Sequence, residues 1–243
     1  MKSKKIIITT SWDDGHPLDI KLCSILQKYN IKGTIYIPIL NKERDVMDEK
    51  EIKKISKNFE IGGHTYNHSV LTNLSNSEID DEIIRSKKKM EEITDTKIIS
   101  FCYPRGKYNK EIMKKVKNAG YVGGRTTEIF RTSFSNSFEL HTTIQAVNRT
   151  LASRGKNVIT SNSRKMTQEL LFTKTLFNKW DVIAKKSLDY VLKNGGIWHL
   201  WGHSWEINDN NDWDTLEDVL EYVQMKGRAH NAEFVTNKEI FCM

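Results

Sequence analysis

The sequence predicts an α/β fold with a mostly parallel sheet, and the chain is long enough for that sheet to curl into a barrel. Short β-branched segments alternate with segments of helical periodicity from one end to the other. The 243 residues suffice for one domain with a sizeable core, and no repeat, linker or low-complexity tract divides them. We therefore expect residues 1–243 to form a single domain.

The first half of the chain is predicted to alternate strands with helices. Strands are expected at residues 6–9, 34–39, 59–61, 98–103 and 121–123. Helices are expected at residues 17–29, 48–57, 75–93 and 110–119. Pro17 opens the first helix, Ser75 and Glu78 form a capping box for the third, and Gly120 ends the fourth.

The second half of the chain is less regular. Residues 125–164 are polar and rich in Ser, Thr and Asn, so we predict short strands and long loops there, within an atypical, insertion-like stretch at 125–195. The remaining elements are expected as helices at 180–193 and 213–226, strands at 197–203 and 232–235, and a short final helix after 236.

Composition and charge exclude several classes of protein. The net charge of +7 comes mainly from scattered lysines, and no basic-aromatic motif indicates a nucleic-acid partner. No apolar run approaches the roughly 18 residues of a membrane span. The three cysteines form no CxxC pair, and the N-terminus runs into a strand without the apolar segment of a signal peptide. We expect a cytoplasmic protein with reduced cysteines, and the sequence leaves its oligomeric state open.

Two acidic residues and two histidines directly follow predicted strands, where parallel α/β folds build their sites. Asp13 and Asp14 are adjacent, so in extended chain they point to opposite sides, and one can serve a metal while the other acts as a base. If residues 64–68 form a helical turn, His64 and His68 lie on one side of it and offer two nitrogen ligands to one metal. The alternatives are a solvated turn that caps the first helix and a pair of surface histidines.

Two further segments carry residues suited to a site. Residues 100–108 run from a strand into a Pro/Gly turn, which is either an ordinary connection or a backbone N–H donor beside a substrate carbonyl. Residues 197–206 hold His199 inside a strand, typical of a core histidine, and His203 at its end, the better site candidate. Three tryptophans in this segment either stack on a sugar or fill the core: Trp198, Trp201 and Trp205. Weaker candidates for a cleft are His16, Arg105, Arg125, His141 and Glu206.

Taken in order, these four segments resemble the motifs of the NodB-homology polysaccharide deacetylases, carbohydrate esterase family 4. The matching sequences are SWDDG at 11–15, HTYNH at 64–68, FCYPRG at 101–106 and HLWGH at 199–203. The resemblance covers roughly residues 6–125 and 195–240. It implies a distorted (β/α) barrel of about seven parallel strands.

The resemblance also implies a metal and two catalytic groups. One divalent ion, Zn²⁺ with Co²⁺, Ni²⁺ or Mn²⁺ as alternatives, would be held by Asp14, His64 and His68. Asp13 would be the general base that takes a proton from the attacking water. His203 would protonate the leaving amine. The backbone N–H of Tyr103 would face the oxyanion, and Arg105 and Trp205 are expected to contact substrate.

The chain departs from the family pattern at two points. The arginine that often orients the base in the third motif is replaced by Cys102, and Arg105 follows three residues later. The Asp-Trp pair that supports the acid histidine is not found. The spacing of the final motif is stretched, which leaves His199 as an alternative acid.

The implied activity is a metal-dependent hydrolase that removes an N-acetyl or related acyl group from an amino sugar or glycan intermediate and releases acetate. A cytoplasmic location favours a nucleotide-linked, lipid-linked or small carbohydrate substrate over whole peptidoglycan or chitin. The alternatives are another C–N amide or ureide hydrolase on the same scaffold, and a non-catalytic carbohydrate-binding relative. The missing arginine and Asp-Trp pair favour the second alternative.

Overall fold

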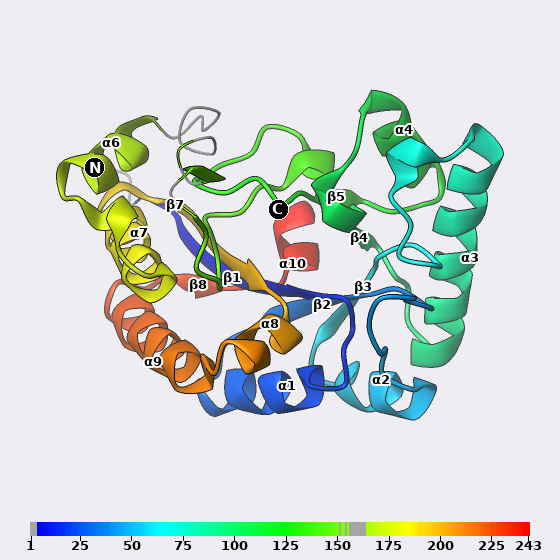
Figure 1. The fold of residues 1–243 in the computed structure, drawn as a ribbon, viewed down its shortest axis with the longest axis horizontal. Helices are drawn as coiled ribbons and strands as arrows, with labels where there is room; N and C mark the ends of the chain where they lie inside the picture. Colours follow the sequence, from blue (N-terminus) through cyan, green and yellow to red (C-terminus); the bar gives the residue numbers. More distant parts are fainter. Residues whose placement is uncertain (1–3, 151, 154, 156–163) are drawn as a thin grey trace.

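Parallel strands form one curled sheet with helices around its outer side (Figure 1). The computed structural model describes residues 4–150, 152–153, 155 and 164–243. The sheet order is β5-β4-β3-β2-β1-β7-β6, and the short β8 pairs with the start of β1. This path of seven strands confirms the expected distorted barrel.

The strands are β1 (Ile6–Asp13), β2 (Gly33–Ile37), β3 (Glu60–Gly63), β4 (Ser100–Cys102), β5 (Gly123–Arg125), β6 (Ile144–Gln145), β7 (Gly196–Gly202) and β8 (Glu233–Phe234). The helices are α1 (Asp19–Lys28), α2 (Glu49–Ile55), α3 (Asn76–Thr94), α4 (Lys110–Asn118), α6 (Arg164–Phe172), α7 (Trp180–Asn194), α8 (Ser204–Asp209), α9 (Trp213–Ala229) and α10 (Asn237–Phe241). Short 3₁₀ turns are η1 (Leu71–Asn73), η2 (Pro104–Gly106), η3 (Ser137–Glu139) and η4 (Thr175–Phe177).

Local sequence signals explain where several helices begin and end. Capping boxes open α2 at Asp48, α3 at Ser75 and α10 at Thr236. Gly195, with φ of 80°, ends α7. The fifth strand lies two residues later than predicted, at Gly123–Arg125, which places Arg125 in the sheet.

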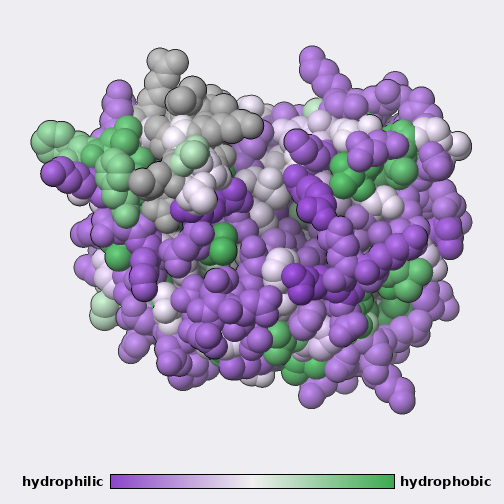
Figure 2. Space-filling view, in the orientation of Figure 1, coloured by the Kyte–Doolittle hydropathy of each residue, from purple (hydrophilic) through white to green (hydrophobic). Residues whose placement is uncertain are grey.

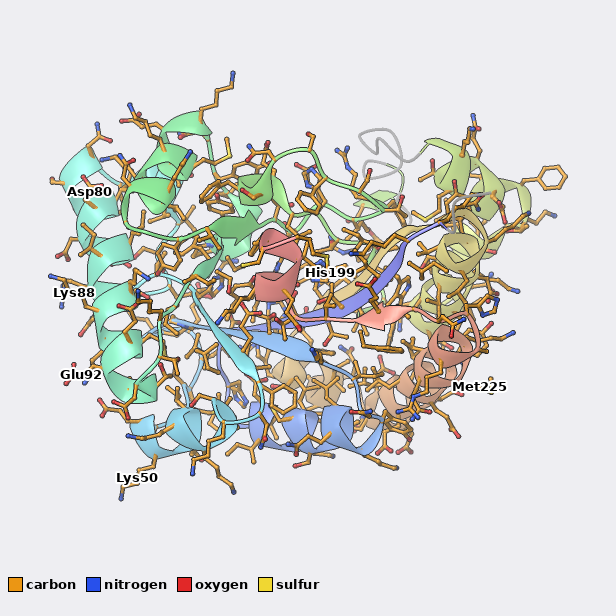
Figure 3. The ribbon with its side chains drawn as sticks, turned by 180° about the vertical axis from the view of Figure 1, so that it is seen from behind. Lys50, Asp80, Lys88, Glu92, His199 and Met225 are labelled. Carbon is orange, nitrogen blue, oxygen red and sulfur yellow. The ribbon has the colours of Figure 1, made fainter. Side chains whose placement is uncertain are left out.

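The interior of the barrel is polar along β1. Alternation turns Ile8 and Trp12 towards the helices, while Thr9, Ser11 and Asp13 face inwards. Each inward group has a buried partner: Asn237 for Thr9, His199 for Ser11 and Arg125 for Asp13. Figure 3 shows the molecule from behind, with α10 in front of the sheet and His199 near the centre. A column of paired polar groups therefore runs through the barrel to the ends of the strands.

The stretch at 125–195 adds β6 beside β7 and places α7 against β7 and α9. Residues 151, 154 and 156–163 of the expected insertion lie outside the described residues. Figure 2 shows a mostly hydrophilic face with an apolar patch over α6, where Phe172 is 90% exposed. Among the described residues, no helix has both the length and the hydropathy to cross a bilayer.

Candidate active site

A cavity of about 510 Å³ opens at the carboxyl ends of the strands, where the sequence predicted the site. A volume of this size suits a small-molecule ligand. Its lining residues are Asp13, Asp14, Glu43, Arg44, His64, His68, Arg105, Thr127, Gln145, Arg149, Trp201, His203, Trp205 and Glu206.

The three expected metal ligands converge in this cavity. The Oδ1 atom of Asp14 lies 3.2 Å from Nε2 of His68 and 3.7 Å from Nε2 of His64. One ligand atom from each of the three residues lies within 4.8 Å of those of the other two. Two imidazoles and one carboxylate with open positions beside them match the donor set of catalytic zinc sites.

Protonation states in the cluster suit metal binding, which needs neutral imidazoles and an ionised carboxylate. Burial lowers the pKa of His64 to about 4. Nδ1 of His64 donates to the carbonyl of Cys102 at 2.8 Å, which leaves Nε2 with its lone pair towards Asp14. Burial opposes ionisation of Asp14, but the hydrogen bond to His68 and the nearby histidines hold its pKa below the usual value.

The histidine pair is not on a helical turn, so that part of the prediction is wrong. Residues 64–68 form a bend in which Thr65 and His68 have φ of 67° and 54°, in the left-handed region that a β-branched residue rarely adopts. The buried carboxylate of Glu82 on α3 holds this bend, because it accepts the backbone N–H groups of Tyr66 and Asn67 at 2.9 Å each. The strained backbone at the site is thus supported by a charge from a neighbouring helix.

The two aspartates reach the same cavity by different routes. Asp13 ends β1 and points into the barrel, whereas Asp14 follows the strand with φ of 77°, which turns its side chain towards the histidines. Asp13 forms an ion pair with Arg125, and both side chains are buried. Asp13 therefore lies beside the histidine cluster but is paired with a cation of its own, which suits its predicted role as a base.

Arg125 supplies the arginine that the sequence motif lacks. Cys102 and Arg125 are direct register partners on the parallel strands β4 and β5, so their side chains point to the same face of the sheet. Cys102 Sγ lies 3.7 Å from Oδ2 of Asp13, and the Arg125 guanidinium binds Oδ1. The cationic partner of the base has moved one strand along the sheet.

A second possible metal group, Asp13 with His64 and Cys102, is chemically unsuitable. Burial raises the pKa of the Cys102 thiol well above its usual value, so it stays protonated, and only a thiolate is a strong ligand. Asp13 is committed to Arg125. The donor set of Asp14 and the two histidines is the one that fits an ion.

His203 is held by a carboxylate that sequence reasoning placed among the weaker candidates. Its Nδ1 lies 2.6 Å from Oε2 of Glu206, one turn later on α8, and its Nε2 lies 3.9 Å from Asp14. Burial lowers the pKa of His203, but the hydrogen bond with Glu206 and the charges of Asp14 and Asp13 outweigh it, so the pKa is raised. Glu206 therefore fills the place of the missing motif aspartate.

Trp205 does not present a free face for stacking on a sugar. Its Nε1 donates to Oδ2 of Asp14 at 3.0 Å, its ring lies beside His203, and the Arg44 guanidinium stands 4.1 Å from the ring centroid. Trp205 instead orients Asp14, one of the three predicted metal ligands. Trp198 fills the core, and Trp201 contributes one wall of the cavity.

The structure removes His199 as an alternative acid. It is fully buried in β7, bonded to Ser11 at 2.8 Å and to the carbonyl of His141 at 3.1 Å, and burial lowers its pKa to about 3. Strand alternation sends it into the barrel below the cavity, whereas His203 follows the strand.

The two predicted substrate contacts Tyr103 and Arg105 differ in position, since the first is buried and the second lies at the cavity rim. The N–H of Tyr103 donates to the carbonyl of Arg125 at 3.4 Å, and the ring is buried, so its oxyanion role stays a prediction. Arg105 lines the cavity at its rim, where it forms an ion pair with Glu43 at 2.6 Å. Of the weaker candidates, His16 lines an adjoining cavity with Glu43, and His141 lies outside the main one.

Comparisons with known proteins agree with this fold. A family model described as polysaccharide deacetylase matches residues 1–124. A polysaccharide deacetylase named YxkH from Bacillus subtilis is 30% identical over 131 residues, which cover 52% of this chain and 46% of that protein. A peptidoglycan-N-acetylglucosamine deacetylase from Bacillus cereus is 28% identical over 117 residues, which cover 47% of this chain and 54% of that protein. The matched regions span about half the length of these relatives.

Solved structures share the fold over the whole chain. A peptidoglycan N-acetylglucosamine deacetylase aligns with 99% of this chain and 90% of its own at 17% identity, with a TM-score of 0.63. A CE4 family pseudoenzyme from Bacillus anthracis aligns with 98% of this chain and 66% of its own at 16% identity, with a TM-score of 0.59. Because the fold hosts both an enzyme and a pseudoenzyme, activity must be argued from the site. With its family model matched over residues 1–124 of 243, this chain belongs to the polysaccharide deacetylase family.

Proposed function

We propose that this protein is a metal-dependent hydrolase that removes an acetyl group from the nitrogen of an amino sugar. The observation that carries the proposal is the completeness of the site. Asp14, His64 and His68 offer a metal donor set, while Asp13 and His203 each have a separate charged partner. A non-catalytic relative would have no use for partners that hold a base and an acid in defined states.

The residues divide the work of amide hydrolysis. A divalent ion held by the cluster would polarise the acetamide carbonyl and make water a better nucleophile. Asp13 takes the proton from the attacking water, and the hydrogen-bonded ion pair with Arg125 orients that carboxylate. His203 carries a proton on Nε2, on the cavity side, because Glu206 binds Nδ1, and it delivers that proton to the departing nitrogen. The products are acetate and a free amino sugar.

The test combines metal content with acetate release. The purified chain is expected to hold about one divalent ion and to release acetate from N-acetylated sugars. A double variant, His64→Ala with His68→Ala, should lose both. Asp13→Asn should keep the metal and lose turnover by a factor of roughly 10²–10⁴.

Two results would overturn the proposal. Full acetate release from the metal-free double variant would refute the metal, and a metal-loaded chain without amidase activity would favour a carbohydrate-binding relative. Loss of metal in Asp13→Asn would show that the roles of the two aspartates are exchanged.

A further inference from the structure

The charges that line the cavity do not cancel within the protein. Three carboxylates there have a cationic partner: Asp13 with Arg125, Glu43 with Arg105, and Glu206 with His203. The fourth, Asp14, would be neutralised by the proposed metal ion. The guanidinium groups of Arg44 and Arg149 are then left without an ion-pair partner among the described cavity residues. Within the described ranges, no carboxylate lies at ion-pair distance from either of them.

Arg149 is placed to receive an anion. It is partly buried in the cavity wall, where its Nε donates to Oε1 of Gln145 at 2.8 Å and its Nη1 to Oγ of Ser153 at 3.4 Å. These acceptors are neutral, and the Glu206 carboxylate acts on the guanidinium only from beyond ion-pair distance, so Arg149 has no direct anionic partner among the described residues. The buried amide of Gln145 connects Arg149 to Glu206, because its Nε2 donates to Oε2 of Glu206 at 3.2 Å. Arg149 is thus linked to His203, the proposed acid, by three successive hydrogen bonds through Gln145 and Glu206.

Arg44 marks a second point on the wall. Its guanidinium lies over the ring of Trp205, which donates a hydrogen bond to Asp14. Arg44 lines both the main cavity and an adjoining one of about 280 Å³. A substrate longer than one sugar would pass Arg44 on its way from one cavity to the other. Guanidinium groups in such positions bind phosphoryl oxygens well, because their planar N–H pairs match two oxygens at once.

We infer that the acetylated sugar which this site accepts carries a phosphoryl group, whose charge is met by Arg149 and Arg44. This inference rests on the proposed deacetylase function and names its substrate class. A neutral glycan would bring no counter-charge to the partly buried Arg149 or to the exposed Arg44 when it displaces water from the cavity, and taking water from an unpaired charge is costly. The phosphorylated sugar replaces that water with charge-assisted hydrogen bonds.

The experiment compares substrates that share one sugar. Acetate release by the metal-loaded full chain is measured with N-acetylglucosamine, N-acetylglucosamine 1-phosphate and the carboxylated N-acetylmuramic acid. We expect kcat/KM to be at least about tenfold higher for the phosphate ester, a preference that weakens with added salt. Arg149→Gln and Arg44→Gln should each reduce the preference, and Arg149→Lys should retain part of it. Arg228→Gln, an exposed site on α9, is the matched control.

Equal kcat/KM for the neutral and phosphorylated sugars would overturn the inference, as would a higher value for the carboxylated sugar or a preference unchanged in both arginine variants. Calorimetric binding of N-acetylglucosamine 1-phosphate separates the inference from the proposed function. If no sugar yields acetate, weaker binding in Arg149→Gln than in Arg228→Gln still supports the phosphoryl site. Equal binding in those two variants overturns it.

Discussion

Arg125 on β5 pairs with Asp13 in place of an arginine at position 102 on β4, and this substitution of roles can be tested by mutation. Arg125 is completely buried and neutralises the buried Asp13, so Arg125→Met leaves a carboxylate without a partner in the barrel. Removing one member of a buried ion pair costs about 3–5 kcal/mol. We expect the free energy of unfolding to fall by that amount and kcat/KM to fall with it, because Asp13 is no longer held as an oriented base.

The rescue variant is Arg125→Met combined with Cys102→Arg. The two positions are register partners, so the guanidinium starts about 4.8 Å away, one strand spacing, and on the same face of the sheet. Cys102→Arg alone should destabilise the protein, since it places a second buried cation beside one carboxylate. The double variant should recover part of both losses, with a coupling energy of about 2 kcal/mol or more.

Urea unfolding and acetate-release kinetics of the four proteins in this cycle measure the coupling. Arg125→Met within about 1 kcal/mol of the parent and fully active would refute the role of the ion pair. A double variant no better than Arg125→Met would refute the idea that the two strands are interchangeable sources of the guanidinium.

Three further predictions follow from the surroundings of the site. Glu206→Gln removes the partner that raises the pKa of His203, so the alkaline limb of the pH–rate profile should move to lower pH. We expect kcat to fall within the roughly 10²–10⁴-fold range of general acid catalysis. An alkaline limb at the same pH as in the parent would contradict this prediction. Trp205→Phe keeps the ring but loses the hydrogen bond to Asp14, so zinc competition titrations should show roughly 10–100-fold weaker binding, and equal affinity would count against its positioning role. His199 has a pKa of about 3 in the folded protein against 6.5 when unfolded, so the unfolded state binds the extra proton. The free energy of unfolding should therefore drop as pH falls from 6.5 towards 3. In urea unfolding, His199→Gln should show a flatter dependence of that free energy on pH, and the same dependence as in the parent would refute the buried neutral state of His199.

Much of the site could be predicted because its central residues lie in short segments directly after strands. The proposed metal ligands Asp14, His64 and His68 are recognisable from residue type and local spacing, and the parallel sheet brings the strand ends together. The conformation of the histidine segment was beyond local rules. The left-handed residues of that bend are tolerated because Glu82, on a helix later in the chain, holds the backbone.

The sequence by itself determined the α/β fold through its periodicity, and its contiguous motifs carried the resemblance from which the proposed metal donor set, base and acid were predicted. Tertiary structure alone decided which charged groups support them. Asp13 and Arg125 are 112 residues apart, and Gln145 and Glu206 are 61 apart. The register of neighbouring strands decides such pairings, because a shift of one residue turns a side chain to the opposite face.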